Sequence, residues 1–562
     1  MCVHAMWLFL CLCALAHAQE MPKVNTKQGV VVGRHVEDGD YLTFYGIPYA
    51  GNTTGENRFK APIPPPVFTE EFQAIDNSVI CAQPSEYGFI GTEDCLVLDI
   101  LTKNLTTPKP VFVWIEGEDY EKTSTRPYPF ENLVEDLVIV KINYRLSIFG
   151  FLCLGVSDAP GNAGLKDIVQ GLKWIKENIA GFGGDPNNVV LVGHGSGAAL
   201  VDLITLSPMS QNLAHKAIVL SGSALAPWAV SYNPISHAQK VAENLGYTDL
   251  SRTDLARKIA STETYLIIGA LSFINFYDTS LLFAPCVENV NLNPSDTFLA
   301  DAPINILKSG NFSQIPYIAG FVNREGTLRV PQIYSHSWIQ EMQIFFDEFI
   351  QVDLAFESKE NKTAVARQIR EFYFGQNTIS TQRMEEYLDY HGDILITLPI
   401  IRASMERAWK SSENVYVMHF SYKGTNNSDW DSEYPYVPIS GARHGAILNY
   451  LFNFDLQVLD KSANIAVAQR FREFAYTGSP SLRPPHTGAV WIPVTSGATS
   501  ILSISGDEKM FVEKVTTDVK TETRMFWDPI LATHYHAPKS SAESLFTFGL
   551  VVCAMQALLR FL

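Results

Sequence analysis

The stretch around Gly195 constrains the fold of this chain more than any other feature. A short β-branched strand, 189–192, leads through the turn GHGSG into the apolar run AALVDL. That order is typical of a nucleophile elbow, G-x-S-x-G, in which a strained strand-to-helix turn lifts a hydroxyl above a parallel sheet. Gly193 and Gly197 hold the flanking positions, where a tight turn leaves no room for a Cβ atom. The residue between them is Gly195, which has no nucleophile.

Ser196 is the neighbouring hydroxyl, but it stands in the wrong register for this motif. If Ser196 were the elbow residue, its flanking positions would be His194 and Ala198, and both carry a Cβ atom. The steric requirement of the turn is then not met. The motif therefore indicates a hydrolase-like site that has lost its nucleophile.

The rest of the chain alternates between predicted strands and helices. Short apolar runs, typical of strands buried on both faces, occur at 111–115, 137–142, 189–192, 217–220, 316–321 and 415–420. Between them, apolar residues repeat at helical spacing over 165–179. This alternation predicts an α/β fold with a central, mostly parallel sheet flanked by helices. The less regular region 328–407 is expected to place helices over the mouth of the site.

Composition and motifs exclude several functional classes. The formal net charge is −17, whereas nucleic-acid binding needs a surplus of lysine and arginine. The chain has no P-loop, no dinucleotide-binding glycine motif after a strand, no HExxH and no His/Cys cluster with metal spacing. We therefore expect no cofactor, no metal and no nucleic-acid partner.

The two termini look like targeting segments. An apolar run followed by Ala16-His17-Ala18 predicts a signal peptide over 1–18. The catalytic-type domain is expected over 19–538, and a hydrophobic tail over 539–562. Small residues at 540–542 precede the tail, as in a GPI-attachment signal, whose tail is removed. Two alternatives for the tail stay open: a short transmembrane stub, or an amphipathic tail on a secreted form.

Five N-x-S/T sequons agree with export; they lie at Asn52, Asn104, Asn311, Asn361 and Asn426. We expect a secreted or cell-surface glycoprotein with a GPI anchor as one form of attachment.

Ordered motifs identify a family. They are FYGIPYAGNTTGENRFKAP, TEDCLVLDI, NYRLSIFGFL, PGNAGLKD, WIKENIAGFGGDPNNV, SGSALAPWA, NREG and ARHG. In this order and over nearly the whole length they resemble the carboxylesterase/cholinesterase family of α/β-hydrolases. The resemblance implies the α/β-hydrolase fold, and it matches Glu325 of NREG and His444 of ARHG to the acid and histidine of the family's triad.

The same resemblance shows a second defect. Where the family has H-G-G-G-F, with glycine amides that stabilise an oxyanion, this chain has Glu116-Gly117-Glu118-Asp119-Tyr120. The oxyanion-hole equivalents are thus Gly117, Glu118, Asp119 and the amide of Ser196. Carboxylates at two glycine positions are expected to restrict the backbone and to repel an oxyanion. His194, where the family has glutamate, is a third departure.

Four cysteines remain outside the terminal segments. The resemblance implies a disulfide between Cys81 and Cys95. A disulfide that closes so short a loop stabilises the folded state by about 3 kcal/mol in the entropic model. Cys153 and Cys286 do not match the usual family cysteines; we expect buried thiols, with an extra bridge as the alternative.

Three functions are compatible with these features. The first is a non-catalytic, esterase-like extracellular protein in cell-surface recognition or adhesion, as the neuroligins, neurotactin, gliotactin and glutactin of this family imply. The second is a carboxylic ester hydrolase that uses Ser196 with His444 and Glu325. The third is a carrier that binds an ester or hormone without cleaving it. We favour the first, with a protein partner at the cell surface, a small ester-like ligand possible in addition, and membrane attachment through the C-terminal tail. Loss of the serine in a comparable triad lowers turnover by a factor of about 10⁶, and this loss weighs against the second function.

Overall fold

The structure is a computed structural model that describes residues 20–542, except 37–38, 126–127, 273, 425–436, 438, 453–457, 486, 496–498, 508 and 518. The expected signal peptide, the apolar part of the expected C-terminal tail and the sequon at Asn426 lie outside the described residues.

Within the described residues, eleven strands form one sheet in the order β16-β15-β14-β13-β12-β11-β9-β10-β8-β4-β3. Its seven central strands pair in parallel; they are β10 (Val138–Ile142), β9 (Lys109–Ile115), β11 (Gly184–His194), β12 (Lys216–Leu220), β13 (Tyr317–Val322), β14 (Val415–Phe420) and β15 (Ile501–Asp507). The edges are antiparallel; they are β8 (Val97–Thr102), β4 (Leu42–Pro48), β3 (Arg34–His35) and β16 (Met510–Thr516). The predicted central, mostly parallel sheet is confirmed.

The apolar runs that predicted these strands are apolar because both faces of the sheet are covered. In β11, Val189 and Leu191 belong to one buried cluster, and Val190 and Val192 belong to the other. Successive side chains of a strand point to opposite faces, so a strand with two covered faces has apolar residues at every position.

Helices cover both faces. The first cluster includes α3 (Ser147–Phe151), α4 (Ala163–Asn178) and α5 (Ser196–Leu206), and the second includes α2 (Glu131–Val134), α16 (Ala446–Phe452), α17 (Val458–Asn464) and α18 (Arg470–Thr477). The helix expected over 165–179 is α4, which buries Ile168, Leu172 and Ile175.

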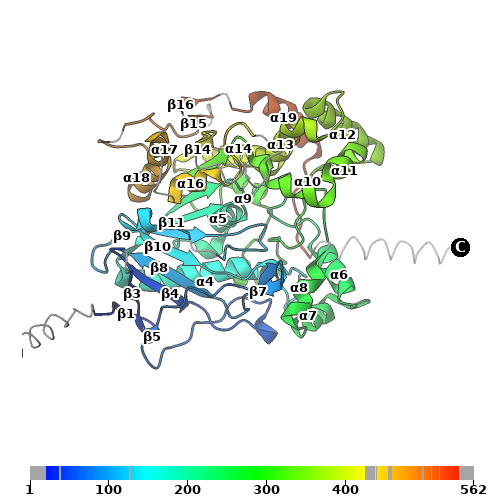
Figure 1. Ribbon diagram of the computed structural model, residues 1–562. Coiled ribbons are helices and arrows are strands. Elements are labelled where there is room, and N and C mark those ends of the chain that lie inside the picture. The colour runs from blue at the N-terminus through cyan, green and yellow to red at the C-terminus, as the bar shows by residue number, and fades with distance from the viewer. Residues whose placement is uncertain are drawn as a thin grey trace, which may run out of the picture.

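The remaining helices form two groups (Figure 1). One group is α6 (Pro234–Asn244), α7 (Arg252–Ala260) and α8 (Thr264–Leu271). The other group includes the helices of the region 328–407 together with α9 and α19. Its members are α9 (Pro303–Ser309), α10 (Val330–His336), α11 (Trp338–Ile344), α12 (Lys359–Phe374), α13 (Met384–Gly392), α14 (Leu398–Lys410) and α19 (Thr521–His534).

Two small sheets lie outside the central one. They are formed by β1 (Lys23–Thr26), β2 (Gly29–Val32) and β5 (Phe72–Gln73), and by the hairpin β6 (Gln83–Ser85) and β7 (Gly88–Ile90).

This topology brings distant motifs to one edge of the sheet. Residue 195 follows β11, Glu325 follows β13, and His444 comes between β14 and α16. Because the carboxyl ends of parallel strands meet at the same edge, these three positions converge there.

Candidate active site

The turn at Gly195 has the strained geometry of a nucleophile elbow. Gly195 lies at φ 58° and ψ −125°, and its carbonyl accepts the first amides of α5, from Ala198 and Ala199. A Cβ atom on Gly193 would lie 2.4 Å from the carbonyl oxygen of Gly197, and one on Gly197 would lie 2.2 Å from that of Ile115. The flanking glycines are therefore required by backbone contacts, as the sequence pattern indicates.

The side-chain position of Gly195 itself is open. Among the described residues, a Cβ atom there would have two neighbours within 4 Å, the Nε2 atom of His444 at 3.7 Å and the carbonyl oxygen of Gly117 at 3.8 Å. A side chain at residue 195 would thus point to the imidazole, as a nucleophile of a triad must. The described structure therefore has room for a side chain at residue 195, where the sequence has glycine.

His444 and Glu325 lie within hydrogen-bond distance. The Nδ1 atom of His444 is 2.6 Å from Oε2 of Glu325, and the amide of Val322 donates to the other carboxylate oxygen at 2.8 Å. The amide of His444 donates to Oγ1 of Thr327 at 2.9 Å. Glu325 is fully buried, whereas the side chain of His444 keeps 23% of its exposure. The structure brings together the two residues that the resemblance matched to the acid and the histidine.

The imidazole of His194 packs against that of His444. Its ring centroid is 4.6 Å from that of His444, and its Nε2 atom is buried without a hydrogen-bond partner among the described residues. Burial holds the pKa of His194 well below its ordinary value, and the neighbouring His444 and Arg443 add to the effect. His194 is therefore a neutral imidazole packed under the site.

The hydroxyl of Ser196 contacts the loop 117–120. Its Oγ atom accepts a hydrogen bond from the amide of Tyr120 at 3.1 Å, and the residue is 4% exposed. A Cβ atom on Gly117 would lie 2.8 Å from the same Oγ atom. The hydroxyl of Ser196 is thus engaged in holding the 117–120 loop rather than placed against His444.

Glu116 turns away from the site. Its carboxylate forms an ion pair with Lys141 at 3.3 Å and accepts the amide of Ser124, while its carbonyl accepts the hydroxyl of Tyr144 at 2.6 Å. Burial raises the pKa of Glu116, and Lys141 opposes that shift. This buried pair was not foreseen, and the lysine inside the apolar strand VIVKI was its only sequence signal.

The two other carboxylates of the oxyanion region are exposed. The expectation that they restrict the backbone is wrong for Asp119, which adopts a left-handed φ of 53°; Tyr120 does so as well, at 59°. Aspartate tolerates this region better than most residues. Tyr120 is fully buried, and its hydroxyl donates to the carbonyl of Ala229, so packing maintains its strained angle. The amide of Glu118 donates to the carbonyl of Lys122 at 2.9 Å, so this amide is already used within the loop.

Two residues of the SGSALAPWA segment hold neighbouring elements together. Trp228 donates through Nε1 to the carbonyl of Leu395 at 2.9 Å, and Ser223 donates to the carboxylate of Asp202. Asp202 also forms a buried ion pair with Arg407 at 2.8 Å.

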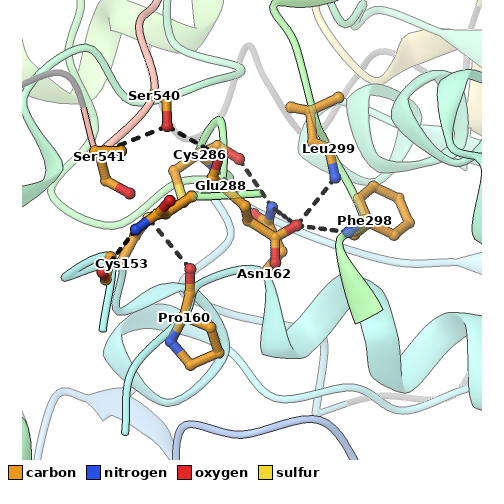
Figure 2. Close-up of a disulfide and its surroundings, with 12 residues drawn as sticks. Cys153, Pro160, Asn162, Cys286, Glu288, Phe298, Leu299, Ser540 and Ser541 are labelled. Carbon is orange, nitrogen blue, oxygen red and sulfur yellow. Dashed lines mark hydrogen bonds between the residues drawn. A yellow bond between two sulfur atoms is a disulfide. The ribbon is translucent and has the colours of Figure 1, made fainter. Parts of the chain in front are cut away.

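Both cysteine pairs form disulfides. Cys81 bonds to Cys95, as the family resemblance implied. The expectation of buried thiols at Cys153 and Cys286 is wrong, because these residues are bonded across 133 positions of sequence. Figure 2 shows Cys153 and Cys286 with their surroundings, which include Pro160, Asn162 and Glu288. Gly161 makes the bond possible, since a Cβ atom there would lie 2.6 and 2.8 Å from the two sulfur atoms.

The sequons differ in accessibility. Asn52 and Asn311 are exposed, and Asn104 and Asn361 are partly buried; glycosylation at the five sites stays a prediction. Among the described residues, no group of three or more His, Cys, Asp and Glu side chains is arranged to hold a metal ion. Within the same part of the chain, none of the helices combines the length and the apolarity needed to cross a bilayer.

Comparison with known proteins agrees with this geometry. The model of the carboxylesterase family matches residues 20–527. Venom carboxylesterase-6 of Apis mellifera is 29% identical over 490 residues, covering 82% of this chain and 86% of that protein. Juvenile hormone esterase of Tribolium castaneum is 30% identical over 446 residues, covering 74% and 75%.

A solved structure supports the fold. The crystal structure of juvenile hormone esterase from Manduca sexta, with OTFP covalently attached, superposes with a TM-score of 0.81 at 24% identity, covering 91% of this chain and all of that one. The sheet order, the elbow at residue 195, the Glu325–His444 pair and the family match over 20–527 lead to one conclusion: this chain belongs to the carboxylesterase family.

Proposed function

We propose that this chain is a non-catalytic member of its family that acts outside the cell in surface recognition or adhesion. The observation that carries the proposal is the glycine at the tip of the elbow, where the open side-chain position faces Nε2 of His444 at 3.7 Å. An acyl-enzyme needs an atom there that can attack a carbonyl. Gly195 offers none.

The altered loop supports the same proposal. An oxyanion hole needs amide donors that are preorganised and not otherwise used. Among the four oxyanion-hole equivalents, the amide of Glu118 donates to the carbonyl of Lys122 at 2.9 Å. The missing nucleophile and this engaged amide are independent defects at one chemical step.

The names of the relatives favour a second candidate, a carboxylic ester hydrolase. Proteins named as esterases align over most of this chain, and Ser196 is the hydroxyl closest in sequence to the elbow tip. Against this candidate stands the hydrogen bond that Ser196 accepts from Tyr120, together with its 4% exposure.

Labelling with a fluorophosphonate probe separates these candidates. We expect no labelling of the native ectodomain and no hydrolysis of short-chain esters above buffer. Gly195→Ser should become labelled, because its hydroxyl would face His444, and Gly195→Ser combined with His444→Gln should label far more slowly. Labelling of Ser196 in the native chain, abolished by Ser196→Ala, would support the hydrolase instead.

The extracellular location rests on separate observations. Two disulfides are typical of oxidising compartments. The signal-like N-terminus, the sequons and the apolar C-terminal segment agree with export and with attachment to a membrane. We propose a protein partner at the cell surface; cells that display this chain should then aggregate with one another or with partner cells, and beads coated with the ectodomain should bind the same cells.

A non-hydrolysing carrier of an ester or hormone remains the third candidate. The open position at Gly195 beside His444 is the feature that favours it, since a ligand carbonyl there would meet an imidazole without being attacked. Thermal shifts on addition of long-chain or hormone-like esters, in the absence of cell binding, would favour the carrier over adhesion.

A further inference from the structure

The last described residues of the chain, up to 542, are bonded to the folded body. After α19, residues 535–542 run as an extended C-terminal strap across the surface. Its first part pairs with the segment 352–355, where the amide of His536 donates to the carbonyl of Asp353 at 2.9 Å and the amide of Ala355 donates to the carbonyl of His534 at 2.8 Å. The strap therefore begins as a bonded segment rather than a loose end.

The last residues of the strap are bonded as well. Ser540 donates through Oγ to the carbonyl of Glu288 at 2.9 Å, and the amide of Ser541 donates to the carbonyl of Val287 at 3.2 Å. Arg252, in the first turn of α7, donates to the carbonyl of Ser541 at 3.1 Å. Ser541 is only 3% exposed.

The surface that receives the strap is rigid. Figure 2 shows Ser540 and Ser541 beside Cys286 and Glu288. Cys286 is held by the disulfide to Cys153, and Glu288 is buried in an ion pair with Lys166 at 2.9 Å. The carboxylate of Glu288 also accepts two backbone amides, from residues 298 and 299. The exit point at residue 542 is thus fixed relative to the body.

Exposed apolar side chains follow or precede the strap's partners Arg252 and Glu288 in the sequence. Leu250 stands two positions before Arg252, and Val290 and Leu292 follow Glu288; they are 42%, 40% and 38% exposed. Tyr265 and Leu266 of α8 are 57% and 45% exposed. Tyr247 links Leu250 to Tyr265 and Leu266, because it lines one surface hollow together with Leu250 and another together with Tyr265 and Leu266. We name Leu250, Tyr265, Leu266, Val290 and Leu292 the exit face.

The charge around the exit differs from that of the whole chain. The net charge of −17 would repel a bilayer that carries anionic lipids. Helix α7, whose Arg252 bonds the strap, carries Arg252, Arg257 and Lys258 against Asp254, and Arg257 is paired with Asp158 at 2.9 Å. Exposed apolar and aromatic side chains near basic ones are the combination that lies at a lipid interface.

We infer that the exit face rests on a lipid bilayer. The inference rests on the membrane attachment in the proposed function and goes beyond it by orienting the body. The apolar stretch of the sequence begins at Leu545, three residues beyond the last residue of the strap, and three residues span at most about 10 Å. An anchor so close to residue 542 brings the exit face to the bilayer. In this orientation the sheet edge with β15 and β16 faces away from the bilayer (Figure 1).

Oxidative footprinting of the full chain on phosphatidylcholine and phosphatidylserine vesicles tests this orientation. We expect the modification of Tyr265 and Leu266 to fall severalfold when the chain is bound to vesicles. Met510 in β16, which is 61% exposed, should stay as reactive as in the free chain. Flotation of the vesicles measures attachment in the same samples.

A charged variant of the exit face makes the test specific. Leu250→Asp with Leu266→Asp should leave the chain attached through its tail but restore the modification of Tyr265. The matched control is Ile492→Asp with Met510→Asp, whose residues are 47% and 61% exposed on other parts of the surface, and it should leave Tyr265 protected.

The remaining outcomes separate the two proposals. A chain that floats with vesicles while Tyr265 stays reactive overturns the orientation and leaves membrane attachment standing. A chain that does not float overturns both. Protection of Tyr265 that increases with protein concentration in the absence of vesicles identifies a second copy as the occupant, and overturns the lipid proposal.

Discussion

The two halves of the site have changed to different extents. On one side, His444 and Glu325 keep a 2.6 Å contact, and the carboxylate keeps its second bond to the amide of Val322. On the other side, the nucleophile is absent at Gly195 and the glycine loop has become Glu116-Gly117-Glu118-Asp119-Tyr120. The acid and the histidine remain beside a residue 195 that has no side chain.

Burial explains why one half remains. Glu325 is 1% exposed, and removal of His444 would leave its carboxylate buried without that partner, which costs about 1–3 kcal/mol or more for a charged group. Replacement of a serine by Gly195 leaves no buried group stranded, because the side chain of His444 is 23% exposed and can be solvated. The comparison teaches that the retained pair has a structural reason to persist and is not by itself a sign of catalysis.

The largest expected effect comes from rebuilding the altered half. Gly195→Ser alone should give weak turnover, because the amide of Glu118 remains bonded to Lys122. Adding Glu118→Gly and Asp119→Gly removes two carboxylates that would repel an oxyanion, and should raise kcat/KM for a short-chain ester by about 10²–10³ for each donor regained. Glu116 is left in place, because it pairs with Lys141. The control is Gly195→Ala in the same double-glycine background. Turnover of an ordinary esterase from Gly195→Ser alone would mean that the loop is not defective.

The elbow glycines should differ sharply in their tolerance of alanine. Gly193→Ala and Gly197→Ala place a Cβ atom 2.4 and 2.2 Å from a carbonyl oxygen, and should lower the free energy of unfolding by about 3 kcal/mol. Gly195→Ala has open space and only its positive φ opposes it, which costs about 1–2 kcal/mol. Urea denaturation measures all three variants. Equal losses would show that the position at Gly195 is not vacant.

The retained half is tested by breaking its pair. Glu325→Ala should lower the free energy of unfolding by about 2–3 kcal/mol, because the amide of Val322 and the imidazole of His444 lose their shared acceptor. Glu325→Gln, which still offers an oxygen, should cost less. Glu118→Ala is the matched surface control and should stay within about 0.5 kcal/mol of the native chain. No loss in Glu325→Ala would remove the structural explanation for the pair.

The smallest expected effect concerns pH. Burial holds the pKa of His194 well below the unfolded value of about 6.5, so the unfolded chain binds a proton that the folded chain does not. The contribution of His194 to stability is therefore present above about pH 6.5 and is lost as the pH falls below it, by at most about 1.4 kcal/mol per pH unit. His194→Gln should flatten this acid-side loss in denaturant titrations at a series of pH values. An unchanged slope would mean that His194 is not a buried neutral imidazole.

Much of the fold could be predicted because it is local or periodic. The apolar runs indicated the central strands, and the spacing of Gly193, Gly195 and Gly197 indicated a turn with no room for side chains at its flanks. The match of Glu325 and His444 came from family motifs, and nothing in their own neighbourhoods would have paired them across 119 residues. The roles of Lys141 and of the Tyr120 amide could not be predicted, since each depends on where a loop turns.

The sequence by itself determined the absence of a nucleophile at residue 195 and the alternation of strands and helices, because chemistry and periodicity are written residue by residue. Only the tertiary structure decided which groups meet. It joined Cys153 to Cys286 where buried thiols were expected, turned Glu116 to Lys141, engaged Ser196 with Tyr120, and bonded the strap at Ser541 beside α7. The reason is physical, since these contacts join residues far apart in the chain, and only the packing of the whole sheet and its helices sets the distances between them.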